Sequence, residues 1–229
     1  TCLDIWSNPD NTVIGDRAYG SDPDTVTRVG LAVNEGLEQG GVIPVVKHFP
    51  GHGDTSTDSH VDLPVVDKTA EQLKEFELIP FQTAIDGGTP CVMVAHILMT
   101  RIGPDLPASL SPEVVTGLLR QELGFDGVVC TDDLTMSAIS NTYGMGEAAV
   151  MAVEAGCDLL LVCHEADNLT AARDALLSAV DAGRISMERL DESVYRILSL
   201  KQEYGLTNDL VGQPDIEALN ARIQAILPQ

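Results

Sequence analysis

The stretch VIPVVKHFPGHGDTSTDSH, residues 42–60, decides the fold because an apolar, β-branched run leads directly into chemically active side chains. The run VIPVV is typical of a buried strand. Lys47 and His48 close this strand, and Gly51 and Gly53 in the loop that follows require unusual backbone conformations. A strand that ends in polar side chains and a glycine-rich loop indicates an α/β fold with a site at the carboxyl ends of its strands.

Four further apolar runs follow the same pattern. They are TCLDI, CVMVAHI, GVVCTDD and CDLLLVCH, at residues 1–5, 91–97, 127–133 and 157–164. Helix-like segments separate the runs, and most of these segments end at a glycine, the residue that favours a helix C-terminus. Near-continuous apolar strands alternating with helices predict five βα units and a parallel sheet covered by helices. A flavodoxin-like open sheet and part of a barrel both fit five such units.

Several helix boundaries carry their own signals. Residues 69–86 are expected to form a single helix, opened by a capping box of Thr69 and Gln72. A second helix is expected to begin at Ser111, a good N-cap residue followed by proline. Beyond residue 205 the sequence predicts a tail, 206–229, with one short helix.

The composition excludes some classes of partner. The formal net charge is -22 for 229 residues and the pI is about 4.2, so the chain should repel nucleic acid and anionic membranes. No apolar run approaches the roughly 20 residues that span a bilayer. Five cysteines, mostly within apolar runs, indicate free buried thiols rather than a disulfide framework. They favour a reducing compartment, and we predict a cytoplasmic location.

The loop after the Lys-His pair permits two chemical interpretations. Its nitrogen and oxygen side chains could bind zinc, but the spacing of His48, His52 and His60 matches no familiar ligand set. Alternatively, Asp58 could hold the imidazole of His60 in one tautomer and support its protonated form, as in a general acid/base dyad. An isolated Asp-x-His sequence is more often an ordinary solvated loop.

Two adjacent aspartates close the fourth strand-like run. One of them can cap the following turn or helix while the other performs chemistry. Asp132 is expected to continue the strand and point into the mouth of the site, which assigns capping to Asp133. His96 and His164, at the ends of the third and fifth runs, are expected to be hydrogen-bonded structural residues.

These residues carry a resemblance to a known family. KHFPGHG with DSH, together with LLRQELGFDGVVCTDDLTM, resembles glycoside hydrolase family 3, and specifically its β-N-acetylglucosaminidase branch. DNTVIGDRAYGSDP is similar to an arginine-bearing loop of that family. The similarity extends over 1–205, which we interpret as one barrel domain. It implies a (β/α)8 TIM-type barrel, of which this chain holds about five C-terminal βα units.

The resemblance also implies a role for individual positions. Asp132 matches the nucleophile, His60 the general acid/base and Asp58 its paired carboxylate. Arg17, Lys47 and His48 match sugar-binding positions. Without the resemblance, Arg17 would be read as a surface ion pair, Lys47 as a strand-end side chain reaching solvent, and His48 as a satisfied core imidazole.

The implied activity is that of a retaining exo-β-N-acetylglucosaminidase. It would release terminal N-acetylglucosamine from muropeptides through a covalent intermediate on Asp132, with no cofactor and no metal. The small aromatic fraction, 4%, agrees with a pocket for one terminal sugar rather than a long cleft. The alternatives are another family 3 β-glycosidase, an N-acetylglucosaminide phosphorylase, a metal-dependent barrel hydrolase and a sugar-binding protein without turnover.

The sequence departs from the family in one respect. Nothing in it resembles the Asp-Gln-Glu-Gly-Gly stretch of the family's earlier strands. Five βα units cannot close an eight-stranded barrel, and they leave strand edges that other chains could pair with. We therefore expect a missing N-terminal barrel segment, or a completing chain, to be needed for activity.

Overall fold

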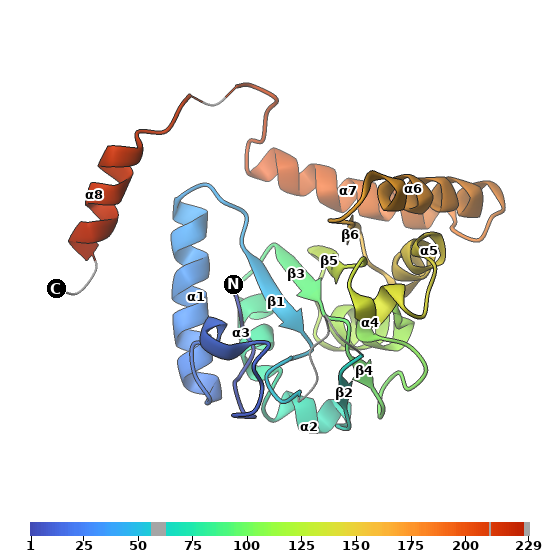
Figure 1. Ribbon diagram of the computed structural model, residues 1–229, viewed down its shortest axis with the longest axis horizontal. Helices are drawn as coiled ribbons and strands as arrows, with labels where there is room; N and C mark the ends of the chain where they lie inside the picture. Colours follow the sequence, from blue (N-terminus) through green and yellow to red (C-terminus); the bar gives the residue numbers. More distant parts are fainter. Residues whose placement is uncertain (56–62, 211, 227–229) are drawn as a thin grey trace.

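The computed structural model describes residues 1–55, 63–210 and 212–226, and within them a parallel sheet forms the centre of the fold (Figure 1). Its strand order is β1-β3-β5-β6, with every neighbouring pair parallel. The strands are β1 (Val45–Phe49), β3 (Cys91–Val94), β5 (Val128–Asp133) and β6 (Leu159–Leu161). Four of the five predicted strands are therefore confirmed in type and direction.

The first predicted strand, at residues 1–5, is only partly formed. Cys2 makes an isolated parallel bridge with Lys47, and the N–H of Leu3 donates to the carbonyl of Lys47 at 2.6 Å. The run therefore lies beside β1 and extends the sheet, but its pairing is limited to this short contact. The sequence did not predict a second sheet, the parallel pair β2 (Val65–Val66) and β4 (Leu98–Met99).

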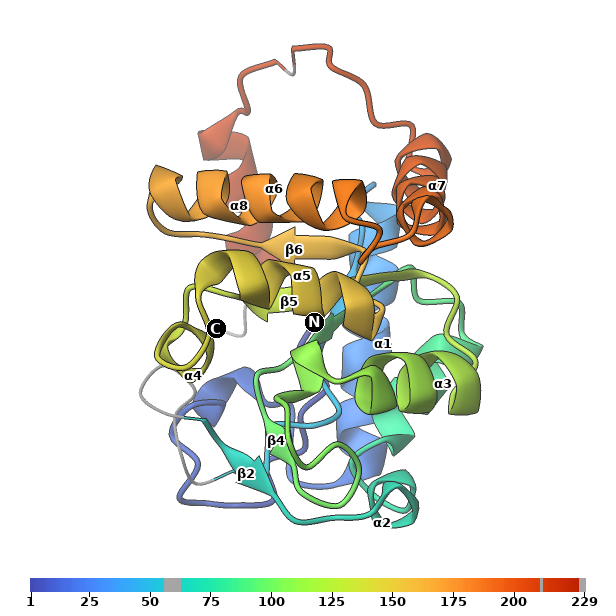
Figure 2. The same cartoon turned by 90° about the vertical axis from the view of Figure 1, so that its right-hand side faces the viewer.

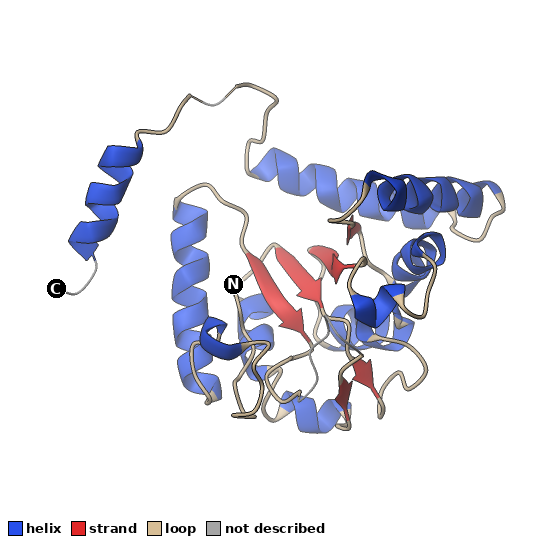
Figure 3. Ribbon diagram, in the orientation of Figure 1, coloured by secondary structure: helices blue, strands red, loops and turns tan. Residues whose placement is uncertain are grey.

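Helices surround the strands, as Figure 3 shows. They are α1 (Pro23–Gln39), α2 (Ala70–Lys74), α3 (Ile79–Asp86), the π-helix η3 (Glu113–Glu122), α4 (Ser137–Ser140), α5 (Met145–Ala155), α6 (Ala166–Asp181), α7 (Met187–Glu203) and α8 (Ile216–Ile226), with 3-10 turns at η1 (Gly15–Arg17) and η2 (Ala108–Leu110). Figure 2 shows α5 and α6 lying side by side near β5 and β6. Most strands of the main sheet are followed by one or more helices, as the alternation predicted.

The expectation of one helix over residues 69–86 is wrong. The capping box of Thr69 and Gln72 is present and opens α2, but the chain turns after Lys74 and restarts at α3. Pro80 lies in the first turn of α3, where its missing N–H costs nothing, whereas it would break a hydrogen bond inside a continuous helix. The same turn points Glu77 inward, where its side chain is 4% exposed.

The two faces of the sheet are buried differently. Val46, Val92 and Val129 are fully buried in the main core, which also contains residues of the surrounding helices. On the opposite face, Cys91 and Cys130 form a smaller cluster to which residues of α7 contribute. Because side chains alternate along a strand, Asp132 shares this second face with Cys130.

A buried carboxylate fixes α7 to the sheet. Asp158 lies just before β6, its side chain is fully buried, and it accepts a hydrogen bond from the Val129 N–H at 3.0 Å. Arg120 of η3 contacts the same carboxylate at 2.5 Å, and Ser193 of α7 donates to it at 2.7 Å. Arg189 of α7 adds a longer contact at 3.4 Å. The Asp158 carboxylate thus links β5, η3 and α7.

The tail beyond α7 makes little contact with the sheet. All described residues from 206 onward are exposed, and Figure 1 shows α8 standing apart from the strands. Within the described residues no helix is long and apolar enough to cross a membrane.

Candidate active site

Several polar side chains lie at the carboxyl ends of the strands, as the sequence predicted. Asp4 ends the first run, Lys47 and His48 lie in β1, and Asp132 and Asp133 end β5. The sequence did not reveal how these side chains divide between structural and chemical roles. The hydrogen bonds make that division clear.

Asp4 organises the first half of the site. Its carboxylate is fully buried, and its Oδ2 lies 2.6 Å from His48 Nδ1. Its Oδ1 accepts a hydrogen bond from the N–H of His52 at 2.6 Å. Burial raises the pKa of Asp4, but the charge and hydrogen bond of His48 outweigh burial, so this pKa lies below its usual value. The sequence places Asp4 in the first apolar run, and its role was not predicted. The only signal was an acid directly after an apolar run.

His52 is the second buried histidine of the loop. Its Nδ1 lies 2.7 Å from Thr55 Oγ1, and its ring lies edge-on to His48 with 5.8 Å between centroids. Burial lowers the pKa of His52, although the charges of Asp4 and Asp132 oppose this effect. His52 is therefore held mainly as a neutral imidazole at neutral pH.

The loop approaches the first strand very closely. Gly51 has a φ of 122°, as the sequence predicted for this loop. A Cβ added at Gly53 would lie 1.8 Å from the carbonyl oxygen of Ile5, so only glycine fits there. The side chain of Asn11 donates to the carbonyl of His52 at 2.7 Å. The start of the loop is thus fixed against residues 5–11.

A lysine ties the two ends of the loop together. Lys68 lies after the loop, and its ammonium contacts Asp54, which lies within the loop, at 2.6 Å and the buried Glu77 at 2.5 Å. The sequence analysis missed this bridge because the three residues are separated by up to 23 positions. Lys68 therefore restrains the start of the loop in addition to Asn11.

The two aspartates of β5 have different surroundings. Asp133 Oδ1 accepts hydrogen bonds from the N–H groups of Thr135 and Cys163, both at 3.0 Å, and its Oδ2 accepts from the Thr135 hydroxyl at 2.6 Å. Burial raises the pKa of Asp133, but these hydrogen bonds hold it below its ordinary value. Asp132 accepts one hydrogen bond from the residues that the structure describes, donated by the neighbouring Asp133 N–H at 2.8 Å.

The remaining strand-end histidines differ from each other. His96 is buried, with Nε2 3.0 Å from the Asp133 carbonyl and Nδ1 2.7 Å from Ser109 Oγ. Burial lowers the pKa of His96, and the expectation of a hydrogen-bonded structural residue is confirmed. The same expectation for His164 is wrong. Its side chain is 76% exposed and its nearest charged partner, Asp133, lies 3.6 Å away.

Lys47 and Arg17 are the two cations that the sequence proposed for sugar binding. Lys47 is half-buried in β1, and within the described residues its ammonium makes no hydrogen bond or ion pair. Arg17 is exposed and donates to the carbonyl of Val13 at 2.7 Å.

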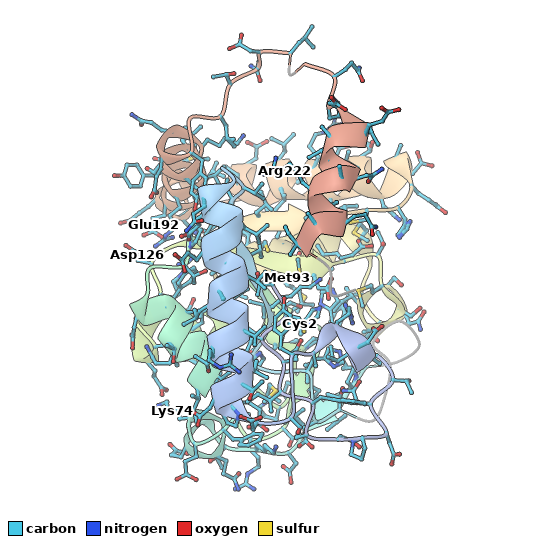
Figure 4. The ribbon with its side chains drawn as sticks, turned by 90° about the vertical axis from the view of Figure 1, so that its left-hand side faces the viewer. Cys2, Lys74, Met93, Asp126, Glu192 and Arg222 are labelled. Atoms are coloured by element: carbon cyan, nitrogen blue, oxygen red, sulfur yellow. The ribbon has the colours of Figure 1, made fainter. Side chains whose placement is uncertain are left out.

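A metal ligand set can also be assembled from the described residues. Cys2, Asp4 and His48 are all buried, and one ligand atom from each lies within 4.8 Å of the others. A separate groove of about 950 Å³ lies at the amino ends of β3 and β5, lined by residues that include Pro90, Asp126 and Glu192. Figure 4 shows Asp126 and Glu192 close together at this groove. It lies at the opposite end of the strands from Asp132.

Comparison with known proteins decides the family. The model of the glycosyl hydrolase family 3 N terminal domain matches residues 2–200. The chain belongs to glycosyl hydrolase family 3. A solved family 3 β-N-acetylglucosaminidase from Paenibacillus sp. str. FPU-7 is 52% identical with a TM-score of 0.90, over 94% of this chain and 41% of that one. The predicted family and its barrel fold, here present in part, are confirmed.

Two other family 3 relatives bear on the chemistry. β-Hexosaminidase LpqI from Mycobacterium tuberculosis is 41% identical over 87% of this chain and 52% of its own length. A solved β-glucoside phosphorylase, BglX, is 31% identical with a TM-score of 0.87, over 96% of this chain and 41% of its own. The chain spans about half the length of the curated relatives it matches.

Only some of the site residues implied by the family 3 resemblance lie in the described part of the chain. The proposed nucleophile Asp132 and the proposed sugar-binding residues Arg17, Lys47 and His48 all belong to the described part of the chain. Asp58 and His60, the proposed acid/base pair, lie outside the described residues. Their roles remain predictions from the resemblance.

Proposed function

We propose that the complete protein is a retaining exo-β-N-acetylglucosaminidase that releases terminal N-acetylglucosamine from muropeptides. The relatives named as β-N-acetylglucosaminidase and β-hexosaminidase support the substrate class. The observation that carries the proposal is the pair of aspartates at the end of β5. Three hydrogen bonds occupy the Asp133 carboxylate, whereas Asp132 keeps most of its acceptor capacity for a ligand.

The proposed mechanism follows from this pair. The Asp132 carboxylate attacks the anomeric carbon and forms a glycosyl ester while the leaving oxygen takes a proton from His60. His60 then deprotonates a water that attacks the same carbon and releases Asp132. Asp58 would hold the imidazole in the required orientation. The unpaired ammonium of Lys47 and the ring of His48, oriented by Asp4, would bind the sugar hydroxyls.

Phosphate is a second candidate acceptor. A neutral imidazole repels an approaching anion less than a carboxylate base would. A family 3 relative that is named as a phosphorylase supports this alternative. We infer that in this protein phosphate competes with water for the glycosyl intermediate, and product analysis with and without phosphate distinguishes the two reactions.

Two further parts of the proposal concern the protein as a whole. We infer that a further barrel segment or a completing chain closes the site. The described sheet supports this inference because it leaves one edge at residues 1–5 and the other at β6 without a further strand. A cytoplasmic location is also proposed, supported by the free cysteines, four of which are buried and one exposed.

The test is turnover of an aryl β-N-acetylglucosaminide by the complete protein. Asp132→Asn should abolish turnover and covalent trapping by a fluorinated substrate analogue, and Asp133→Asn is the matched neighbour that should still be labelled. His60→Ala should lose least activity with leaving groups that need no proton. Labelling of the Asp132→Asn protein at the same rate as wild type would refute the assignment of the nucleophile.

A further inference from the structure

Cys2, Asp4 and His48 combine three different kinds of metal ligand in one buried place. They come from two neighbouring parts of the sheet, since Cys2 and Asp4 lie on the first run and His48 on β1. Their exposed fractions are 7%, 0% and 4%. Figure 4 shows Cys2 within the body of the fold, beside α1. Such a set is not a solvated acidic cluster, whose carboxylates are exposed.

The geometry centres on one oxygen atom. Asp4 Oδ2 lies 2.6 Å from His48 Nδ1 and accepts a hydrogen bond from Cys2 Sγ at 3.1 Å. The other oxygen, Oδ1, is held by the N–H of His52 at 2.6 Å. The His48 N–H also lies 3.3 Å from both oxygens. Backbone N–H groups therefore hold the carboxylate, while Oδ2 also faces a thiol and an imidazole. A cation placed there would replace two hydrogen bonds without releasing Oδ1.

We propose that Cys2, Asp4 and His48 form a site for a zinc ion, with a fourth position left to water. A thiolate, an imidazole and a carboxylate suit zinc or cobalt better than magnesium or calcium, which prefer oxygen ligands alone. Binding breaks the Cys2 S–H bond and the His48 Nδ1–H bond that faces Asp4, and it forms a metal–sulfur and a metal–nitrogen bond. The thiol proton goes to solvent, and the imidazole carries its proton on Nε2 instead of Nδ1. The thiolate and the carboxylate together then balance the two charges of the ion.

The ligand atoms need only a small rearrangement. Tetrahedral zinc with bonds of about 2.0–2.3 Å places its ligand atoms about 3.3–3.6 Å apart. All three ligand atoms already lie within 4.8 Å of one another. The contacts at 2.6 and 3.1 Å must therefore open by about 0.7 and about 0.4 Å, which side-chain rotation can supply.

Zinc at this site would inhibit sugar binding. His48 Nδ1 would coordinate the metal, and the movement would shift the ring that the proposed function assigns to the sugar. This consequence depends on the proposed function, whereas metal binding does not. The two can therefore fail separately, and the experiment measures binding first.

Cobalt provides a direct probe of the thiolate. The purified chain should take up one equivalent of Co²⁺ and develop the near-ultraviolet charge-transfer absorption of a cobalt–thiolate bond, which Zn²⁺ then abolishes. Cys2→Val should lose this absorption and weaken zinc binding at least tenfold. Cys163→Ser removes the exposed cysteine and is the matched control, which should behave like wild type. Circular dichroism checks that both variants are folded.

The outcomes are decisive in either direction. Absorption in wild type and Cys163→Ser but not in Cys2→Val supports the site. No absorption in wild type, or equal absorption in Cys2→Val, overturns it. In the complete enzyme, zinc should lower turnover by wild type and spare Cys2→Val, each protein being compared with its own turnover without metal. Equal inhibition of both proteins by zinc would overturn the inferred effect on sugar binding, because the inhibiting ion would then act elsewhere, whereas the cobalt absorption decides the metal site itself.

Discussion

The adjacent aspartates of β5 allow structure and chemistry to be separated by two single substitutions. Asp133→Ala removes three accepted hydrogen bonds, two from N–H groups at 3.0 Å and one from a hydroxyl at 2.6 Å. Hydrogen bonds to charged groups contribute about 1.5–3 kcal/mol each, but donors near the surface recover part of this from water. We expect a loss of about 3 kcal/mol. At about 2–4 °C per kcal/mol for a chain of this size, the midpoint of thermal unfolding should fall by about 6–12 °C.

Asp132→Ala removes one hydrogen bond, donated by the next residue in the chain. Its cost in stability should be below about 1 kcal/mol, because the Asp133 N–H can turn to water. Turnover by the complete protein should fall by about 10³-fold or more, equivalent to about 4 kcal/mol of transition-state stabilisation. Thermal unfolding by circular dichroism and hydrolysis of an aryl β-N-acetylglucosaminide measure the two effects. If Asp132→Ala retains turnover, or destabilises the fold as much as Asp133→Ala, the division between the two residues is wrong.

Three further predictions follow from other contacts. Asp158→Asn should destabilise the fold by about 3–5 kcal/mol, measured by urea unfolding, because it leaves Arg120 buried beside a neutral amide. Gly53→Ala should lower both stability and turnover, since its Cβ would overlap the Ile5 carbonyl; an unchanged unfolding midpoint would contradict this. The depressed pKa of Asp4 contributes stability that is present above its unfolded pKa, about 3.9, and is lost as pH falls below it. Asp4→Asn should flatten this acid-induced loss, which unfolding measured between pH 3 and pH 7 would detect.

The alternation of apolar runs and helices was sufficient to predict the parallel sheet. Strand burial on both faces leaves a continuous hydrophobic signal, and the capping box of Thr69 is a local pattern. The break between α2 and α3 was missed because the periodicity on either side of it is helical. Pro80 was the available signal, and its position in a first turn of a new helix explains the break.

The site was predicted at the level of strand ends but not of contacts. The assignment of capping to Asp133 and chemistry to Asp132 agrees with the hydrogen bonds, because a turn directly after a strand needs a local acceptor. Asp4 and Lys68 were missed because their partners lie about 10 to 50 positions away in the chain. Such pairs become visible only when the chain has folded.

Two charged groups at this rim, Lys47 and Asp132, have no charged partner among the described residues. Asp4, Asp133 and His96 each have their polar atoms occupied by neighbours, so they can hold the site but have little capacity left for a ligand. Lys47 and Asp132 carry opposite charges, and the described contacts do not pair them with each other. Leaving partly buried charges without counterions costs free energy. A fold optimised for stability alone would pair or replace them, so two such charges at this rim agree with the proposal that it binds a polar ligand.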